Sequence, residues 1–579
     1  MTKQKYLASH VKLFGLGLLL FLFGLIFVIT FHSSAKADAA TLLKHPDNSL
    51  RSIIKHDHRM VCSSPALGHA SCAAEISTNT KGNPLTETPA TSGAYGPTAF
   101  HTAYNLPCTP GGSVASACST PSTYGPDTIA IVDAGNFSTG VSGLNTSLGD
   151  YDTYYGIAAC TTSDGCLNVV NETGASSPLP TYTGWSDEIA LDVESAHMVC
   201  QTCAIVLVEA SDTLTSDLAQ AELTAATFDP VSISNSWSGD DDTPYNSDFE
   251  DEGIAVVSAT GDGGSVSNGQ DWPADLPDVV AVSGTTLQLN SDDTWNSETV
   301  WDDSGGGCSI NYAAPSWQTS LSNWASAGCG SYKAFGDVSA DADPNTGAAV
   351  NMNGSWYESG GTSLATPMIA AMFALSGGVS SGTIAPSVPY ANSVSNAADF
   401  HDITSGTDCS GSNITHCTAG TGFDTPSGLG SPDGISGFGN LPAEPTLSAK
   451  TINQNQIDLS WTASNGVSGY HLYRNGTLID TTSSTSYNDS GLTPNTTYNY
   501  YVIAYTSGGT GSLASQTASA FSAYPADINE DGHINLLDLS DLASEYGECN
   551  ASLGRSDING DGCVNLLDLS LLASAYDSE

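Results

Sequence analysis

Basic residues are scarce in this chain. Its 579 residues contain 13 Lys and Arg against 61 Asp and Glu, which gives a formal net charge of -48 at pH 7. A surface with this excess of negative charge repels phosphate backbones and anionic lipid. We therefore expect no nucleic-acid partner and no electrostatic attachment to a membrane surface. The chain is not poor in core-forming residues, because 40% of it is hydrophobic. We therefore expect several folded domains rather than charge-driven disorder.

Long apolar runs are also rare, and the one that stands out lies at the N-terminus. Three lysines precede an apolar run from 13 to 31, and small residues follow it, including an Ala-x-Ala at Ala35 and Ala37. This order is typical of a secretory signal, which we assign to residues 1–39. The run of about 19 residues is longer than a usual signal core, so an uncleaved membrane anchor stays an alternative. Either way, the rest of the chain is expected to be secreted or attached to the cell surface.

The cysteines agree with export. All 14 fall into neighbour pairs along the chain: Cys62/Cys72, Cys108/Cys118, Cys160/Cys166, Cys200/Cys203, Cys308/Cys329, Cys409/Cys417 and Cys549/Cys563. An even number in an exported chain predicts disulfides. The sequence does not fix their connectivity, and short loops between neighbours are the simplest hypothesis. For Cys200-Gln-Thr-Cys203 the alternative to a structural disulfide is a redox-active cysteine pair.

Short apolar runs alternate with helical stretches in residues 95–440. The runs are Thr128 to Val132, Ala204 to Val208, Val231 to Ser234, Ile254 to Val257 and Val279 to Val282. Strands that are apolar at every position are buried on both faces, which predicts a parallel sheet with helices on both faces. We expect an α/β domain here, preceded at residues 40–94 by an N-terminal extension or short pro-segment.

The apolar pattern changes to period two in residues 441–523. Ile457, Leu459 and Trp461 alternate with polar residues, and Asn475-Gly476 between two such runs is typical of a tight hairpin. The spacing from Leu492 to Tyr498 fits a tyrosine corner. This segment resembles a fibronectin type III domain, which implies an all-β, immunoglobulin-like sandwich.

A calcium-loop pattern occurs twice in residues 524–579. The stretch from Asp527 to Asp538 recurs from Asp557 to Asp568, and each copy has oxygen ligands at loop positions 1, 3, 5 and 12 with Gly at 6. The candidate ligands, with position 7 contributing its carbonyl, are Asp527, Asn529, Asp531, His533 and Asp538 in the first loop and Asp557, Asn559, Asp561, Cys563 and Asp568 in the second.

These paired loops, each followed by an expected helix (Leu539 to Tyr546 and Leu569 to Tyr576), resemble a type I dockerin. The resemblance implies a small α-helical module that holds two calcium ions and binds a cohesin on a scaffold or cell surface. The loop positions that help choose the partner are Leu-Leu in both copies. A calcium-stabilised terminal module without a cohesin is the alternative.

Ser363 is the nucleophile candidate. It lies in Gly361-Thr-Ser-Leu-Ala-Thr-Pro367, directly before a helix-forming apolar run from Met368 to Leu375. A helix N-terminus offers the positive end of the dipole and free N–H groups near the serine oxygen. The string resembles the nucleophile motif of subtilisins and of their acid-active relatives, the sedolisins or serine-carboxyl peptidases. A subtilisin would take its base from a His-Gly-Thr-His string, and the chain has none.

Two carboxylates are the candidate base. Glu188 and Asp192 are four residues apart in a helical stretch, so they share a helix face. Like charges held close raise at least one pKa, so the pair can share a proton in acid. The sedolisin resemblance implies that Glu188 is the general base toward serine and that Asp192 orients it. An ordinary solvated helix face is the alternative.

Asp262 is the candidate oxyanion donor. It follows the apolar stretch 253–260 and precedes Gly263, where a subtilisin would carry the Asn of its oxyanion hole. A protonated Asp can donate a hydrogen bond to a developing oxyanion. The resemblance pairs Asp262 with the backbone N–H of Ser363, and a turn cap is the alternative. Asp133 stands where a subtilisin has its catalytic Asp. The sedolisin resemblance implies no catalytic role for it.

A further calcium site is implied near the end of the α/β region. Asp402-Ile403 and Gly420-Thr-Gly422-Phe-Asp424 resemble the family's site, in which two carboxylates and loop carbonyls hold one ion. Glycines that serve turns only are the alternative.

We therefore expect an exported, acid-active serine-carboxyl endopeptidase that hydrolyses protein or peptide substrates through an acyl-enzyme on Ser363 and is tethered by its dockerin-like module. One alternative is a neutral subtilisin-type protease with His197 as its base. Another is a non-catalytic surface or scaffold-binding protein. Sedolisins usually carry a large pro-domain, whereas about 55 residues separate signal and catalytic region here, so the resemblance leaves open how activity is restrained.

Overall fold

A computed structural model describes the following residues of the chain: 51, 53–62, 66–86, 88–89, 93–107, 128–239, 243–265, 271–395, 397–409, 416–439, 445–453, 455–464, 467–493, 496–505, 515, 517–522, 526–529, 533–549 and 555–576. The predicted signal at 1–39 and the candidate ligand Asp531 lie outside them. Within these ranges no helix has both the length and the apolar character that crossing a membrane requires.

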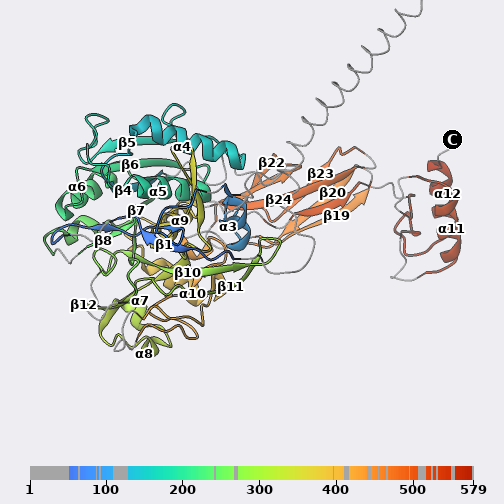
Figure 1. The fold of residues 1–579 in the computed structure, drawn as a ribbon. Helices are drawn as coiled ribbons and strands as arrows, with labels where there is room; N and C mark the ends of the chain where they lie inside the picture. The colour runs from blue at the N-terminus through green and yellow to red at the C-terminus, as the bar shows by residue number, and fades with distance from the viewer. Residues whose placement is uncertain are drawn as a thin grey trace, which may run out of the picture.

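The α/β region is built on an eight-stranded sheet (Figure 1). Its strands are β4 (Thr128–Ala134), β5 (Leu167–Asn171), β6 (Ala204–Ala210), β7 (Ser232–Asn235), β9 (Ala255–Ala259), β10 (Val280–Leu289), β11 (Trp295–Val300) and β14 (Val338–Asp341). The order is β11-β10-β9-β7-β4-β6-β5, with β14 also beside β10. Only β11 pairs antiparallel among these strands. The prediction of a parallel sheet is confirmed.

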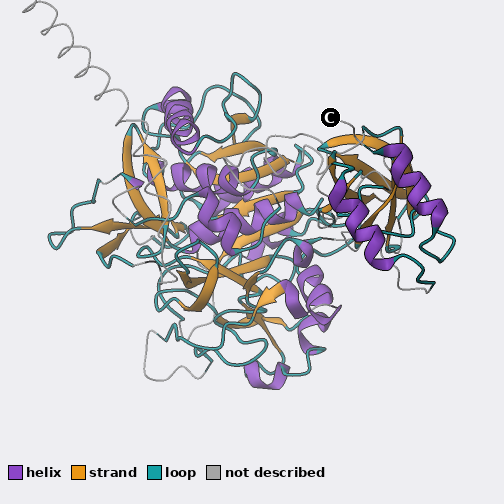
Figure 2. Cartoon of the chain, turned by 90° about the vertical axis from the view of Figure 1, so that its right-hand side faces the viewer, coloured by secondary structure: helices purple, strands orange, loops and turns teal. Residues whose placement is uncertain are grey.

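Helices cover both faces of this sheet (Figure 2). The main ones are α4 (Gly140–Tyr155), α5 (Ser186–Val199), α6 (Thr215–Ala226) and α9 (Thr362–Leu375). On β4, Ile129 and Ile131 join the hydrophobic core that contains α5 and α9, whereas Ala130 and Val132 join the core that contains α6. Because successive strand residues point to opposite faces, β4 is apolar at nearly every position.

The described part of the segment before residue 95 packs onto the α/β region by strand pairing. β1 (Asp57–Met60) and β3 (Glu75–Thr78) form an antiparallel sheet with β16 (Ser355–Gly360) and β15 (Ala348–Met352). β2 (Ser71–Cys72) pairs antiparallel with β8 (Trp237–Ser238). The segment therefore contributes strands to the fold that holds Ser363.

Shorter elements complete this region. They are α3 (Pro97–Ala103), η1 (Thr243–Phe249), β12 (Gly307–Ala313), α7 (Ser316–Thr319), α8 (Trp324–Ala327), β13 (Tyr332–Phe335), α10 (Ser387–Ser395), η2 (Ala397–Asp399), β17 (Phe400–His401), β18 (Ser431–Pro432) and η3 (Ser436–Phe438).

The disulfides follow the predicted pairing of neighbours. The structure contains Cys62–Cys72, Cys160–Cys166, Cys200–Cys203, Cys308–Cys329, Cys409–Cys417 and Cys549–Cys563. Cys108 and Cys118 lie outside the described residues. Cys200 and Cys203 are 1% and 2% exposed, and a redox-active pair requires more access than that.

The third region is an all-β sandwich. One sheet contains β19 (Leu447–Asn453), β20 (Gln456–Trp461) and β23 (Ser486–Ser490), and the other contains β21 (Gly469–Arg474), β22 (Thr477–Thr482), β24 (Thr497–Tyr505) and β25 (Ala518–Phe521). Asn475 and Gly476 join β21 to β22 with positive φ values of 49° and 78°, as a primed hairpin turn requires. The hydroxyl of Tyr498 accepts a 3.0 Å hydrogen bond from the N–H of Thr493, which closes the expected corner.

The C-terminal helices are α11 (Leu536–Glu545) and α12 (Leu566–Ala575). Each begins three residues before the expected start. The reason is a capping box: Asn535 accepts from the N–H of Leu537 while Asp538 accepts from the N–H of Asn535, and α12 repeats the arrangement. Both helices therefore start inside the calcium-loop pattern, at its tenth position.

Candidate active site

Ser363 is the second residue of α9 and is fully buried. Gly361 caps the helix with a φ of 103°, a conformation that L side chains rarely adopt. A Cβ at Gly361 would also overlap the carbonyl oxygen of Ala73 and the Oδ2 atom of Asp262. The hydroxyl of Ser363 donates a 3.1 Å hydrogen bond to the carbonyl of Ser236, which directly follows β7. The glycine turn thus places the serine in a tightly packed site.

Three carboxylates gather beside this serine. Glu188 and Asp192 lie on α5, which packs along α9, and Asp133 lies near the end of β4. One carboxylate oxygen of each lies within 4.8 Å of the others, and all three residues are fully buried. The alternative of a solvated helix face for Glu188 and Asp192 is therefore wrong.

The packing of these carboxylates shifts their proton affinities. Burial, followed by the charges of Asp192 and Asp133, raises the pKa of Glu188 well above its usual range, and the hydroxyl of Ser363 acts in the opposite direction. Burial and the charge of Asp133 raise the pKa of Asp192 in the same way. Burial raises the pKa of Asp133 to about 7. A cluster of this kind retains and shares protons in acid.

Asp262 is hydrogen-bonded to Thr362, the residue directly before the serine. Its Oδ1 atom accepts two hydrogen bonds from Thr362, one from the N–H and one from the hydroxyl, both 2.8 Å long. Its Oδ2 atom is buried without a hydrogen-bond partner. Burial, followed by the charge of Glu75, raises the pKa of Asp262 well above its usual range, although the Thr362 N–H opposes the shift. A proton on Oδ2 would leave a free O–H donor pointing into the site.

These groups lie where the parallel strands end. Asp133 is near the carboxyl end of β4, Ser236 follows β7, and Asp262 comes shortly after β9. The carboxyl ends of parallel strands share one edge of a sheet and form the usual site there. Sequence reasoning missed Ser236 and the contact of Asp133 with the pair on α5. The position of Ser236, two residues after the apolar run that ends at Ser234, was the one signal available.

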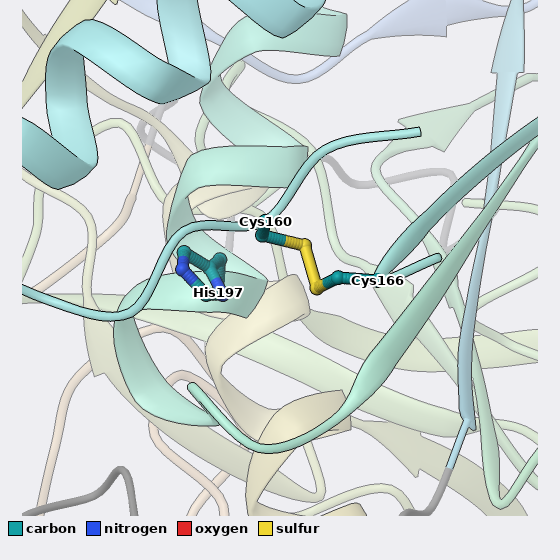
Figure 3. A group of neighbouring side chains, drawn as sticks. All are labelled: Cys160, Cys166 and His197. Carbon is teal, nitrogen blue, oxygen red and sulfur yellow. A yellow bond between two sulfur atoms is a disulfide. The ribbon is translucent and has the colours of Figure 1, made fainter. Parts of the chain in front are cut away.

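His197 does not serve this site. It lies nine residues beyond Glu188 on α5, which is about 13 Å along the helix axis. Its Nε2 atom is 3.2 Å from Oδ1 of Asp152 and 2.9 Å from the carbonyl oxygen of Ala158. Figure 3 shows its ring beside the Cys160–Cys166 disulfide, whose sulfurs, being bonded, offer no thiolate for a metal. The geometry gives no support to His197 as a base for Ser363.

The loop tail of the α/β region brings the candidate calcium ligands together. The N–H of Gly422 lies 3.1 and 3.0 Å from the two carboxylate oxygens of Asp402, and the N–H of Gly420 donates a 2.7 Å bond to Asp424. Burial, and to a smaller extent the charge of Asp402, raises the pKa of Asp424 to about 6. Ile403 is buried next to Asp402. Two adjacent carboxylates in a carbonyl-rich loop fit a hard cation.

The second loop of the C-terminal repeat wraps around the first of its candidate ligands. Asp557 accepts hydrogen bonds of 2.9 to 3.2 Å from the N–H groups of Gly560, Asp561 and Gly562. Asp568, at the start of α12, accepts from the N–H of Asn559 at 3.0 Å. The loop thus directs carboxylate oxygens inward, as a Ca²⁺ loop requires.

Asp538 of the first loop, which lies among the described residues, is placed in the same way. In the first loop Asp538 accepts from the N–H groups of Ile528 at 2.6 Å and Asn529 at 3.2 Å, so it spans that loop as Asp568 spans the second. The thiol of Cys563 is held in a disulfide with Cys549, which leaves its carbonyl as its available oxygen donor. The donor sets of both loops fit calcium.

Known proteins match different parts of this chain. Residues 442–521 match the model of the fibronectin type III domain, and residues 525–575 match the model of the dockerin type I domain. Kumamolisin from Bacillus sp. (strain MN-32) is 32% identical over 321 residues, covering 50% of this chain and 56% of kumamolisin. Sedolisin from Pseudomonas sp. (strain 101) is 34% identical over 197 residues, covering 32% of each chain.

A solved structure of Pseudomonas sedolisin, a serine-carboxyl proteinase in complex with two molecules of pseudo-iodotyrostatin, is 26% identical and covers 59% of this chain and 95% of that one, with a TM-score of 0.48. The chain spans about half the length of kumamolisin and about a third of that of sedolisin. Its α/β region is homologous to proteins of the sedolisin family, and a fibronectin type III domain and a dockerin type I domain follow.

Proposed function

We propose that this chain is a secreted serine-carboxyl endopeptidase that is active in acid and is held on a scaffold by its dockerin domain. The observation that carries the proposal is the convergence of Ser363, the buried carboxylates on α5 and Asp262 at one edge of the parallel sheet. Sedolisin-family homologues over the same region support it.

Each group has a role in peptide hydrolysis. Ser363 attacks the peptide carbonyl while Glu188 takes the hydroxyl proton, and the same proton then passes to the leaving amine. Asp192 and Asp133 hold Glu188 in a cluster that retains a shared proton. The backbone N–H of Ser363 and the protonated Oδ2 of Asp262 hold the oxyanion. Water then releases the acyl group from Ser363.

The role of Asp262 sets the pH range. When Asp262 carries a proton, its O–H group donates to the oxyanion; when it loses that proton, its charge repels the oxyanion. Its raised pKa keeps the acid form present over a wider range than an exposed Asp would allow. Complete protonation of the Glu188 cluster removes the base at the lowest pH. We therefore expect a bell-shaped profile on the acid side of neutrality.

Calcium binding and scaffold attachment are two further proposed roles. The two dockerin loops hold one calcium ion each, through Asp527, Asn529, Asp531, His533 and Asp538 and through Asp557, Asn559, Asp561, Cys563 and Asp568. The ions would fix α11 and α12 in place, and the α/β region would hold a third ion between Asp402 and Asp424. The paired leucines at the start of the helices are 59% to 69% exposed, which favours a partner surface: Leu536, Leu537, Leu566 and Leu567. The proposed partner is a cohesin on a scaffold.

The test is cleavage of a denatured protein by the full chain, with calcium, at several pH values from about 3 to 8. Ser363→Ala and Glu188→Gln are the test variants. Asp187→Asn is the matched control, because Asp187 neighbours Glu188 on α5 and is absent from the buried carboxylate cluster. We expect acid activity in the parent and in Asp187→Asn, and none in the other two. Activity that peaks near neutrality and survives Glu188→Gln would contradict the carboxylate base.

A further inference from the structure

Glu209 is a buried carboxylate close to the proposed active site. It is the last residue but one of β6 and is 1% exposed. Within the described residues, neither of its carboxylate oxygens accepts a hydrogen bond of ordinary geometry. Burial of a carboxyl group destabilises a fold unless the group is hydrogen-bonded. A buried Glu209 therefore requires an explanation, and a proton shared with a neighbouring carboxyl group supplies one.

Strand register places Glu209 next to Asp133. β6 pairs parallel with β4, and these two residues are direct partners in that pairing. The side chains of such partners begin about 5 Å apart, because neighbouring strands have this spacing. Neither oxygen of Asp133 accepts a hydrogen bond within the described residues either. The longer side chain of Glu209 can therefore bring one unpartnered carboxyl group against the other.

Both carboxylates point to the sheet face that α5 covers. On β6, Ile205 and Leu207 lie in the hydrophobic core that contains α5 and α9, as Ile131 does on β4. Side chains alternate between the two faces along a strand, so Glu209 and Asp133 follow these residues to the same face. Glu209 thus lies on the side of the sheet where the carboxylates of the proposed active site gather.

The titratable groups around Glu209 come from two elements. β4 contributes Asp133, and α5 contributes Glu188 and Asp192 on the far side of Asp133. β5 contributes Asn171, the other register partner of Glu209, which does not titrate. α6 packs on the opposite face of β6. The neighbouring charge that acts on Glu209 is therefore that of Asp133.

The surroundings keep Glu209 protonated in acid. Burial, followed by the charge of Asp133, raises the pKa of Glu209 to about 8, and the N–H of Phe137 acts in the opposite direction. A neutral carboxyl group has one O–H donor and remaining acceptor capacity. Glu209 can therefore donate a hydrogen bond to its neighbour throughout the acidic range.

Glu188 needs such donors. Burial raises the pKa of this base well above its usual range, yet a base must be ionised before it can take the serine proton. A neutral carboxyl group that donates its O–H to a carboxylate stabilises the ionised form. A chain of such donors can run from Asp133 to Asp192 and on to Glu188, since one oxygen of each lies within 4.8 Å of the others. Asp133 is free to donate in that direction when another group donates to it.

We propose that Glu209 is a positioning residue of the Ser363 site, whose protonated carboxyl group donates a hydrogen bond to Asp133 and directs the Asp133 proton toward the pair on α5. The inference rests on the proposed function. Hydrogen bonds in a chain polarise one another, so the outermost donor still stabilises the ionised base. Glu209 acts on the reaction through Asp133, and its removal should make Glu188 harder to ionise.

The test is the acid limb of kcat/KM for the full chain with calcium on a peptide substrate, from about pH 2.5 to 6. Glu209→Met removes the donor and keeps the length of the side chain. We expect this limb to move by about half to one unit toward higher pH, which is the effect of one hydrogen bond, and the rate below the limb to fall about threefold to tenfold. Glu209→Gln keeps an N–H donor and should leave the limb within about 0.2 units of the parent.

Glu222→Met is the matched control. Glu222 is a fully buried glutamate of α6, which packs on the opposite face of the sheet from the Glu188 cluster. The control loses the same kind of buried carboxyl group, so it reports what this loss does to the fold in general. Its acid limb should coincide with that of the parent. A limb that moves as far as in Glu209→Met would assign the shift to a general structural change and contradict the inference.

The direction of the shift separates a donor from a charge. A Glu209 that acted only through negative charge would oppose the ionisation of Glu188, so both of its variants would move the limb toward lower pH. That result would overturn the inference and leave the proposed function standing. The same conclusion follows if neither variant moves the limb, or if Glu209→Gln moves it as far as Glu209→Met.

A parent chain without acid activity would refute the proposed function, and the contact is then tested without catalysis. In the Ser363→Ala background, the urea midpoints of Asp133→Ala, Glu209→Met and their double variant are compared near pH 4. If the two carboxyl groups are in contact, the double variant should lose less than the sum of the two single losses. Additive losses would overturn the inference.

Discussion

The substitution Asp262→Asn isolates the group that we hold responsible for the acid optimum. An Asn side chain can keep Oδ1 as the acceptor of the two Thr362 bonds and place an NH₂ group where Oδ2 now lies without a partner. The amide donates to the oxyanion at any pH. The variant should therefore stay active at pH values where the parent has lost its proton on Asp262.

The size of the effect follows from two terms. An ionised Asp262 about 4 Å from the oxyanion repels it by about 4 kcal/mol at an effective dielectric constant near 20, which is about a thousandfold in rate. Asp262→Ala removes the donor altogether and should cost about 100-fold to 1,000-fold at every pH. Asp262→Asn should remain within about tenfold of the parent at its optimum and exceed it above the alkaline limb.

The assay is kcat/KM of the full chain on a peptide substrate from about pH 3 to 8, because this ratio reports the groups of the free enzyme. Asp303→Asn is the matched control. The charge of Asp303 contributes to the raised pKa of Asp262, so its removal should move the alkaline limb to lower pH and leave the maximum nearly unchanged. An Asp262→Asn profile that superimposes on that of the parent would refute the reasoning, because the alkaline limb would then belong to a group other than Asp262.

Three further predictions concern stability and calcium. Burial raises the pKa of Asp133 to about 7 and that of Glu209 to about 8, so the folded protein binds these protons more tightly than the unfolded chain. In urea unfolding of an inactive variant, the free energy of unfolding should be greatest below about pH 4 and should fall by about 1.4 kcal/mol per pH unit for each group up to these pKa values. Asp133→Asn should show a smaller slope. Lys333 is fully buried, with Nζ hydrogen-bonded to three carbonyls and 3.7 Å from a carboxylate oxygen of Asp337. Lys333→Met should lower the free energy of unfolding by about 3 to 5 kcal/mol, because it leaves Asp337 buried without its ion pair. A Lys333→Met/Asp337→Asn double variant that recovers none of this stability would contradict the ion-pair argument. Asp568→Ala should bind one calcium fewer per chain by metal analysis and unfold its C-terminal helices at lower temperature, whereas an unchanged calcium content would rule out the second loop as an ion site.

The strands and helices of the α/β region were predictable because their signals are local. Apolar runs located β4, β6, β7, β9 and β10, since a strand buried on both faces has no other composition available. Element ends were predicted less well. The C-terminal helices start earlier than expected because their ends depend on the capping bonds of Asn535 and Asn565, which an apolar pattern does not register.

The sequence by itself determined the residue types of the proposed chemistry: a serine after a glycine turn, two carboxylates one helical turn apart, and a carboxylate after a buried strand. Their spacing along α5 and α9 is a property of the helix, so it could be read without coordinates. Only the tertiary structure decided that the α5 carboxylates are buried together with Asp133. Their depth depends on α5 packing against α9, and no local pattern encodes it.

The place of the N-terminal segment was also decided only by the tertiary structure. The sequence of this segment does little to predict where it packs, because Ala70–Ala74 are small residues without a strong local preference. Its place against Ser236 and Ser363 comes from main-chain hydrogen bonds between segments far apart in the sequence. Main-chain donors and acceptors are the same at every residue, so such contacts leave almost no trace in the sequence and become visible only when the chain is folded.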